Sequence, residues 1–157
     1  KISRIKTKSN HRLMLTGIDI NPHLLALGKR KCPSNTQFLE QDLLTNGVLI
    51  PICDILLCSQ FLYHFKDEEL LNWLELNRRK IGHALIISEI SRSRYWIPLF
   101  RAITWAMGVH SIVYRDGSSS IKKSWKKREL VKLLRSSNQF QNIIGFNFIF
   151  RYILICR

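Results

Sequence analysis

The sequence has few acidic residues and no long apolar run. Aspartate and glutamate number 11 against 25 lysines and arginines, which gives a formal charge of +14 over 157 residues. This balance favours anionic partners, namely nucleic acid, an acidic membrane surface or phosphate-bearing ligands, although a solvated basic face is the more common explanation. The longest apolar candidate, 95–109, is too short to span a bilayer and contains Arg101.

Cysteine is also sparse, and it forms no recognisable pattern. There is no CxxC pair, and no histidine lies at zinc-ligand spacing beside the four cysteines, so we expect no metal site. Cys53 and Cys58 lie in an apolar stretch and are expected to be buried thiols. Reduced cysteines and the lack of a visible signal peptide favour a cytoplasmic protein.

Segments typical of strands and helices alternate along the chain. Hydrophobic residues make up 46% of the sequence, which is enough for a folded core. The order predicts an α/β fold over a single domain, 1–157, with a Rossmann-like, mostly parallel sheet flanked by helices. Strands are expected at 13–20, 36–40, 53–58 and 84–89, helices at 23–31, 67–80, 95–107 and 125–135, and an antiparallel C-terminal hairpin at 140–146 and 149–156.

Local signals set several of these boundaries. Asn21 followed by Pro22 is typical of a helix start, and the first helix is expected to bury Leu24, Leu25 and Leu27. The run 53–58 is apolar on both sides, as in a central parallel strand. Residues 116–120, which include Asp116 and Gly117, are expected to form a loop. Ser124 is expected to cap the next helix.

Polar residues follow four of the predicted strands. They are Asp19, Asp42, the pair Ser59-Gln60 and Glu89. In doubly wound sheets, ligands bind beyond the carboxyl ends of the strands, so this set favours a nucleotide-like ligand. A carboxylate at Asp19 can accept both hydroxyls of a ribose, and one at Asp42 can accept from an adenine amino group. Any one of these residues could instead simply begin a loop.

Four motifs in this order resemble class I S-adenosylmethionine (SAM) dependent methyltransferases. They are 15–22 (LTGIDINP), 38–42 (FLEQD), 53–65 (CDILLCSQFLYHF) and 84–90 (ALIISEI). The chain is most similar to methyltransferases of ubiquinone and menaquinone biosynthesis and to relatives beside polyketide synthase genes. The similarity covers nearly the whole chain.

The resemblance implies that SAM is the cofactor and names the residues that bind it. In the family pattern, Asp19 binds the ribose, Ile20 and Asn21 flank the adenine, Asp42 and the backbone of Leu43 contact the adenine edge, and Ser59 and Gln60 lie beside the methionine end.

One family feature is not found among the 157 residues. The family's first strand ends in a glycine-rich loop that approaches the methionine part of SAM closely, which only glycine permits. By the family pattern this strand precedes Lys1 and lies between the strands that end at Asp19 and begin at Cys53. We therefore expect the chain to be a methyltransferase domain that is incomplete at its N-terminus.

The implied activity is methyl transfer to a small hydrophobic acceptor, either phenolic, quinone-like or polyketide-like. Catalysis by SAM is mostly alignment, but an acceptor hydroxyl benefits from a general base. His64, His110 and Asp116 are the candidates, with Glu89 a further one. The alternatives are an RNA or protein methyltransferase, and a non-catalytic module that binds nucleic acid or an anionic membrane.

The segment 95–107 is unusually aromatic and has three interpretations. It could be a core helix packed on the sheet, or a lid over an apolar aromatic acceptor. Its aromatic side chains and the flanking arginines also allow peripheral membrane contact.

Overall fold

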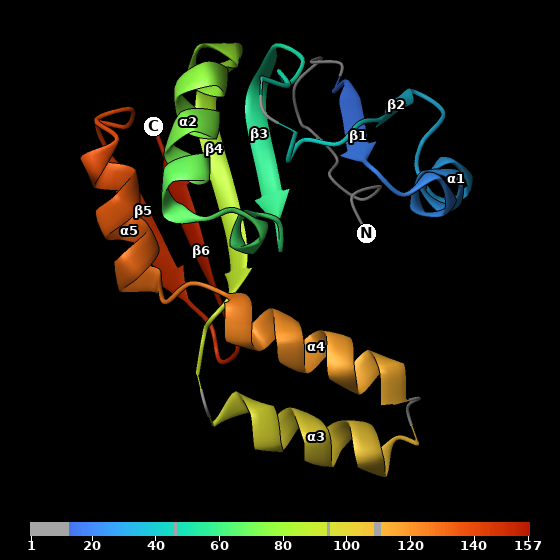
Figure 1. The fold of residues 1–157 in the computed structure, drawn as a ribbon. Helices are drawn as coiled ribbons and strands as arrows, with labels where there is room; N and C mark the ends of the chain where they lie inside the picture. The colour runs from blue at the N-terminus through green and yellow to red at the C-terminus, as the bar shows by residue number, and fades with distance from the viewer. Residues whose placement is uncertain (1–12, 46, 94, 109–110) are drawn as a thin grey trace. The chain divides into compact units, whose positions relative to one another are not determined.

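The structure, a computed structural model, describes residues 13–45, 47–93, 95–108 and 111–157 (Figure 1). The chain divides into two compact units, 1–48 and 49–157. The prediction of one domain over 1–157 therefore stays a prediction.

The first unit is a β-α-β element. Strands β1 (Leu15–Asp19) and β2 (Thr36–Glu40) are parallel and pair in register from one end to the other. Helix α1 (Pro22–Lys31) connects them and packs on β2, where its Gly28 leaves room for the ring of Phe38. A Cβ atom at Gly28 would lie 2.6 Å from that ring.

The start of α1 confirms the expected cap. The Asn21 side-chain oxygen accepts hydrogen bonds from the backbone N–H groups of His23 (2.9 Å) and Leu24 (3.4 Å). The expected inner face is only partly correct, because Leu25 is buried whereas Leu24 and Leu27 are exposed. One short strand pair offers α1 a narrow apolar surface, so a single leucine is enough to cover it.

The second unit contains a four-stranded sheet in the order β3-β4-β6-β5. Its strands are β3 (Cys53–Ser59), β4 (Ile81–Ile90), β5 (Ile143–Asn147) and β6 (Arg151–Cys156). Strands β3 and β4 are parallel, and β6 runs antiparallel to both β4 and β5. The C-terminal hairpin is thus confirmed, and the longer strand β4 lies between a parallel and an antiparallel neighbour.

Two helices of this unit, α2 (Asp67–Asn77) and α5 (Lys127–Ser136), lie over one face of the sheet (Figure 1). A short 3₁₀ turn, Arg78–Lys80, completes the segment that was expected to be helical to residue 80. The buried core combines side chains from these helices and the sheet: Leu70, Leu74, Leu85, Ile87, Leu130, Leu134 and Leu154.

The other face of β3 corrects an expectation. Its continuous apolar run predicted burial on both faces, but Ile55 is 56% exposed and Leu57 is 58% exposed. No helix of the described part of this unit covers that face of β3. Cys58 points to the covered side and is buried, as expected, and burial raises the pKa of its thiol to about 12. Cys53 is only half-buried.

Helices α3 (Trp96–Ala106) and α4 (Ser111–Lys123) pack side by side beyond the carboxyl end of β4 (Figure 1). Helix α3 confirms the expected helix, whereas the loop expected at 116–120 is wrong, because these residues lie inside α4. Gly117 faces Phe100 of α3 so closely that a Cβ atom there would lie 2.5 Å from the ring. The small residues that indicated a loop instead allow close approach of two helices.

The cap expected at Ser124 is also wrong. Ser124 is buried, and its hydroxyl donates to the Ser120 carbonyl (2.6 Å), four residues earlier, so it belongs to the end of α4. Helix α5 begins after Lys126, whose backbone N–H donates to the Glu129 carboxylate (3.2 Å). The glutamate at the third helical position thus replaces the expected serine as the polar group at this terminus.

The α/β fold class is confirmed. Two of the four described strand pairings are parallel and two are antiparallel, so the architecture is mixed rather than mostly parallel. The described strands form a two-stranded sheet, β1-β2, and a four-stranded sheet, β3-β4-β6-β5. The helices that the structure describes include none long and apolar enough to cross a membrane.

Candidate functional site

In the first unit, the polar residues meet at the carboxyl edge of the β1-β2 pair. Asp19 is the last residue of β1, and its backbone carbonyl accepts a hydrogen bond from the N–H of Gln41, just beyond β2 (3.1 Å). Asp42 follows at once, so Asp19 and Asp42 share one edge. This is the placement that a ligand at the strand ends requires.

The Asp19 carboxylate is held in a defined direction. Its Oδ1 accepts from the backbone N–H of Asn21 (2.8 Å), and Oδ2 accepts no hydrogen bond from the residues that the structure describes. Asn21, not Asp19, caps α1. One carboxylate oxygen of Asp19 therefore remains for a ligand.

Both carboxylate oxygens of Asp42 accept hydrogen bonds within its own turn. Its Oδ1 accepts from the N–H of Leu44 (2.9 Å) and its Oδ2 accepts from the hydroxyl of Thr45 (3.1 Å). These bonds fix the loop that also contains Leu43, which is half-buried. Ile20, the residue after β1, is exposed. Each carboxylate oxygen of Asp42 keeps a second lone pair for an outside donor.

In the second unit, Ser59 is the last residue of β3 and Gln60 follows it, next to the carboxyl end of β4. The Gln60 N–H donates to the Ser88 carbonyl (3.0 Å), and Gln60 has a φ of 53°. A non-glycine residue in this left-handed region carries backbone strain, on the order of 1–2 kcal/mol, and such strain gathers at functional sites. The Gln60 side-chain oxygen faces the guanidinium of Arg151 and accepts from it.

Glu89 accepts hydrogen bonds from the loop that follows β3. It is fully buried, and its Oε1 accepts from the backbone N–H groups of Phe61 (3.0 Å) and Leu62 (3.0 Å). Its Oε2 has no hydrogen-bond partner among the described residues. Burial raises the pKa of this carboxyl against the lowering effect of the two backbone bonds and of the Arg151 charge. Glu89 thus holds the loop after β3 in place and is too buried to serve as a general base for an acceptor.

Of the three predicted catalytic residues, the structure describes His64 and Asp116, which lie on different elements. His64 ends a short 3₁₀ helix, Leu62–His64, and is exposed beside the ring of Tyr63. Partial burial and the charge of Lys123 lower the His64 pKa, which favours the neutral imidazole that a base requires. Asp116 is exposed on α4, about 10 Å along the helix from Lys123. His110 lies outside the described residues.

An apolar cavity of about 230 Å³ lies between α3, α4 and the turn of the hairpin. Trp96, Phe100 and Ile103 line it from α3, which supports the interpretation of this helix as the wall of an acceptor pocket. Trp105 on the same helix is 84% exposed. The complete lining is Ile90, Trp96, Phe100, Ile103, Gly117, Ile121, Phe150 and Arg151.

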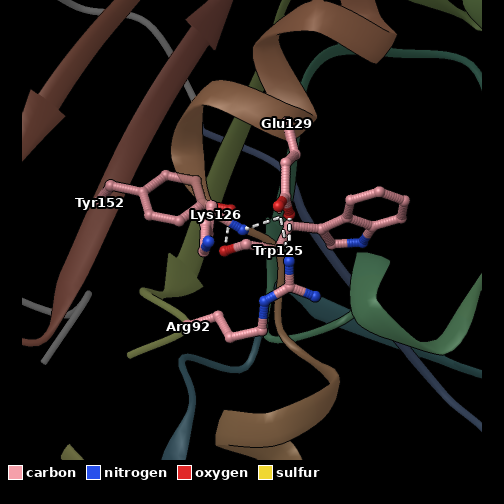
Figure 2. Close-up of polar contacts among 5 residues, drawn as sticks. All are labelled: Arg92, Trp125, Lys126, Glu129 and Tyr152. Atoms are coloured by element: carbon pink, nitrogen blue, oxygen red, sulfur yellow. Dashed lines mark hydrogen bonds and ion pairs between the residues drawn. The ribbon is translucent and has the colours of Figure 1, made fainter. Parts of the chain in front are cut away.

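Trp125 anchors this helical pair to the sheet. Its indole Nε1 donates to the Leu62 carbonyl (3.3 Å), and its own carbonyl accepts from the Tyr152 hydroxyl (3.2 Å) on β6. Figure 2 shows the second of these bonds next to the ion pair in which Arg92 donates to both carboxylate oxygens of Glu129, each at 2.6 Å. Burial raises the pKa of Tyr152, so its hydroxyl stays protonated and can donate.

A second hollow of about 470 Å³ lies over α5 and includes Arg92 and Glu129. These two residues pair with each other, and the other charged residues of the lining are Asp67 and Lys132. Among the described residues there is also no group of three or more histidine, cysteine or acidic side chains that could hold a metal ion.

Sequence reasoning missed Arg151 and Trp125. Arg151 was one of 25 basic residues, and nothing in the order of the sequence marked it as the one at the cavity. Trp125 was assigned to a helix, although it lies in the connection between α4 and α5. The available signal was an isolated tryptophan between two basic segments. Tryptophan is buried far more often than lysine or arginine, so its position there indicates a contact with the core.

No known protein-family model matches the sequence, and no curated protein matches it. Solved structures do match. Human N-acetylserotonin methyltransferase in complex with SAM is 15% identical, with a TM-score of 0.59 over 92% of this chain and 40% of that one. Magnesium protoporphyrin IX methyltransferase from Synechocystis PCC 6803 with bound SAH is 16% identical, with a TM-score of 0.54 over 91% of this chain and 63% of that one.

The chain has the fold of class I SAM-dependent methyltransferases. A third neighbour, described as a pericyclic reaction enzyme, has a TM-score of 0.60 at 13% identity, over 94% of this chain and 36% of that one. The same fold therefore occurs in an enzyme of another reaction class, and the site must decide the reaction. The chain spans only 36–63% of the length of these three proteins.

Proposed function

We propose that the protein transfers a methyl group from SAM to a small hydrophobic acceptor of phenolic, quinone-like or polyketide-like character. The observation that carries this proposal is the position of Arg151. Its guanidinium lines the apolar cavity and also holds the side chain of Gln60. Gln60, which is expected beside the methionine end of SAM, thus contacts a residue that lines a cavity suited to an apolar acceptor.

The described side chains fit the cofactor. Asp19 has a directed carboxylate with one oxygen available to a ribose hydroxyl, and Asp42 lies on the same edge for the adenine amino group. In the proposal Ile20 and Asn21 flank the adenine, and the backbone of Leu43 contacts the adenine edge. Ser59 and Gln60 border the methionine end. The strained backbone of Gln60 also supports a functional role for this residue, because strain of this kind is retained where function requires it.

Bound SAM supplies an electrophilic methyl group on its sulfonium, and the protein aligns the acceptor with it. The aromatic side chains of α3 exclude water from the acceptor and orient its rings. His64 is the group we assign to accept the proton of an acceptor hydroxyl on an imidazole nitrogen, since its lowered pKa keeps it neutral near pH 7. Asp116 and His110 stay candidates for that role.

Trp96→Ala and Phe100→Ala test the acceptor pocket. In an N-terminally extended form that binds SAM, each should raise the acceptor KM about tenfold and leave SAM affinity nearly unchanged, because the aromatic surface is lost from the cavity alone. Methyl transfer from radiolabelled SAM to a panel of phenols and quinols measures the first quantity. Calorimetry measures the second.

Trp105→Ala is the matched control. It removes the same side chain from the same helix, but at an exposed position outside the cavity lining, and should leave KM unchanged. Equal effects of Trp96→Ala and Trp105→Ala would place the acceptor elsewhere. Activity confined to RNA or protein acceptors would replace the small-molecule proposal by its nearest alternative.

A non-catalytic module that binds nucleic acid or an anionic membrane is the alternative of another class. No neighbour named above is described with either partner, so both stay predictions from the charge. Salt-sensitive RNA binding without saturable SAM binding would favour that module over the enzyme.

A further inference from the structure

The cavity is apolar except at one end. Seven of its eight lining residues carry no charge, and Arg151 is the eighth. Three of the seven are aromatic, and two of these, Trp96 and Phe150, pack against each other at a centroid distance of 4.5 Å. The volume of about 230 Å³ exceeds the roughly 150 Å³ of an engineered cavity that binds benzene, so one or two rings can enter.

The charge of Arg151 is not compensated by a direct ion pair. Arg151 is half-buried at the start of β6, opposite Ile90 of β4. Its contact with Gln60 is to a neutral amide oxygen. The described part of the chain places no carboxylate within 4.0 Å of its guanidinium.

Glu89 is the neighbouring acid, and it does not fill this role. The Arg151 charge acts on Glu89, but at a distance greater than an ion pair, and the bound oxygen of Glu89 is turned to the N–H groups of Phe61 and Leu62. Burial raises the Glu89 pKa, which favours its neutral form further. A half-buried cation without an anion is costly, and a ligand anion would remove that cost.

We infer that the cavity selects a small aromatic acceptor that carries an anionic oxygen, a carboxylate or an ionised phenol, which pairs with Arg151 while its rings pack on Trp96, Phe100 and Phe150. Guanidinium binds such oxygens through two parallel N–H donors, a geometry that lysine does not reproduce. This inference deepens the proposed function and rests on the cavity being the acceptor site. It also places the anionic oxygen beside Gln60.

Direct binding tests the inference without any methyl transfer. The probes are 2-naphthoate and its uncharged methyl ester, titrated into the full chain by calorimetry. The naphthoate should bind at least about tenfold more tightly than the ester, as expected for one charge-assisted contact in a partly desolvated site. Tighter binding of the ester, or no binding of either probe, would overturn the inference.

Arg151→Met preserves most of the apolar stem and removes the charge. It should lower naphthoate affinity about tenfold and leave ester affinity unchanged, whereas Arg157→Met, at an exposed position just beyond the far end of β6, should change neither. Arg151→Lys should give an intermediate naphthoate affinity. An unchanged naphthoate affinity in Arg151→Met would overturn the assignment, and if that variant does not fold, the lysine variant and the wild-type preference decide.

A SAM titration in an N-terminally extended form separates the two levels of the proposal. Absence of SAM binding together with selective naphthoate binding would remove the methyltransferase proposal and keep the anion site. SAM binding with no preference for naphthoate would keep the methyltransferase proposal and remove the anion site.

Discussion

Asp19 is the polar residue whose replacement should damage cofactor binding most. Asp19→Asn should weaken SAM binding by about 10- to 100-fold in a form of the protein that binds SAM, because a charge-assisted hydrogen bond contributes roughly 1.5–3 kcal/mol. The melting temperature should hardly change. An asparagine can still accept from the Asn21 N–H through Oδ1, and the cap of α1 belongs to Asn21.

Calorimetry and thermal melting measure these two quantities. Asp54→Asn is the control, since its side chain is 88% exposed and its contact is an exposed ion pair with His83. An unchanged SAM affinity in Asp19→Asn would remove Asp19 from the cofactor site. A large loss of thermal stability would instead assign it a structural role.

Glu89 should make stability depend on pH. Burial raises the pKa of the folded carboxyl above its ordinary value of 4.5, so the folded protein holds this proton over a pH range in which the unfolded chain has released it. The free energy of unfolding therefore falls as the pH rises through this range. The contribution of Glu89 is greatest below the unfolded pKa and is lost as the pH passes the folded one.

Glu89→Gln removes that titration. The wild-type free energy of unfolding should fall relative to that of the variant as the pH rises from about 4.5 through the raised pKa of the folded carboxyl, at about 1.4 kcal/mol for each unit of pKa difference. Urea unfolding at several pH values measures the difference. Glu75→Gln, an exposed glutamate of α2, should show no such trend. A difference that rises with pH in favour of the wild type would show that the Glu89 pKa is lowered.

At the scale of elements, the close contact between α3 and α4 depends on Gly117. Alanine in a helix is about 1 kcal/mol more favourable than glycine, but a Cβ at Gly117 would lie 2.5 Å from the Phe100 ring. Overpacking of this kind typically costs about 1–3 kcal/mol, so Gly117→Ala should lower the melting temperature. Phe100→Leu combined with Gly117→Ala should restore the melting temperature.

Ser119→Ala is the matched control on the exposed side of α4, and it should raise stability slightly through helix propensity. Thermal melting followed by circular dichroism compares the three variants. If Gly117→Ala stabilises the protein as much as Ser119→Ala does, the glycine is not needed for the contact between the helices.

At the scale of the whole molecule, SAM binding should depend on sequence that these 157 residues do not contain. They include seven glycines, none of them grouped into the glycine-rich loop of the family. The 157-residue chain should therefore bind SAM at least about tenfold more weakly than an N-terminally extended form, because donors to the methionine end are missing. Calorimetry on both forms measures this, and equal affinities would show that the loop is dispensable.

The sequence alone determined the order and type of nearly all elements. The continuous apolar runs at β3 and β4 and the Asn21-Pro22 start of α1 are local signals. Such signals predict an element without knowledge of the elements that it packs against. The same holds for the strand-end acids, because a residue that follows an apolar strand emerges at the carboxyl edge wherever that strand lies. The resemblance to methyltransferases added the cofactor, and the structural neighbours agree with its fold.

Only the tertiary structure decided how these elements meet. Gly117 and the serines after it indicate a loop when read locally, and only the Phe100 ring shows why small residues are needed inside a helix. Ser124 has the right residue type for a cap, but burial at the end of α4 gave that role to Glu129 in the next helix.

Arg151 shows the same limit at the candidate site. In the sequence it is one basic residue among many, and its importance depends on a cavity that the hairpin forms with α3 and α4, two helices that lie well before the hairpin along the chain. Glu89 stands at a strand end like Asp19, yet full burial makes it a support for a loop. The sequence determines which groups are available, and long-range packing decides which of them face water, a cavity or another backbone, because burial is a property of the assembled chain.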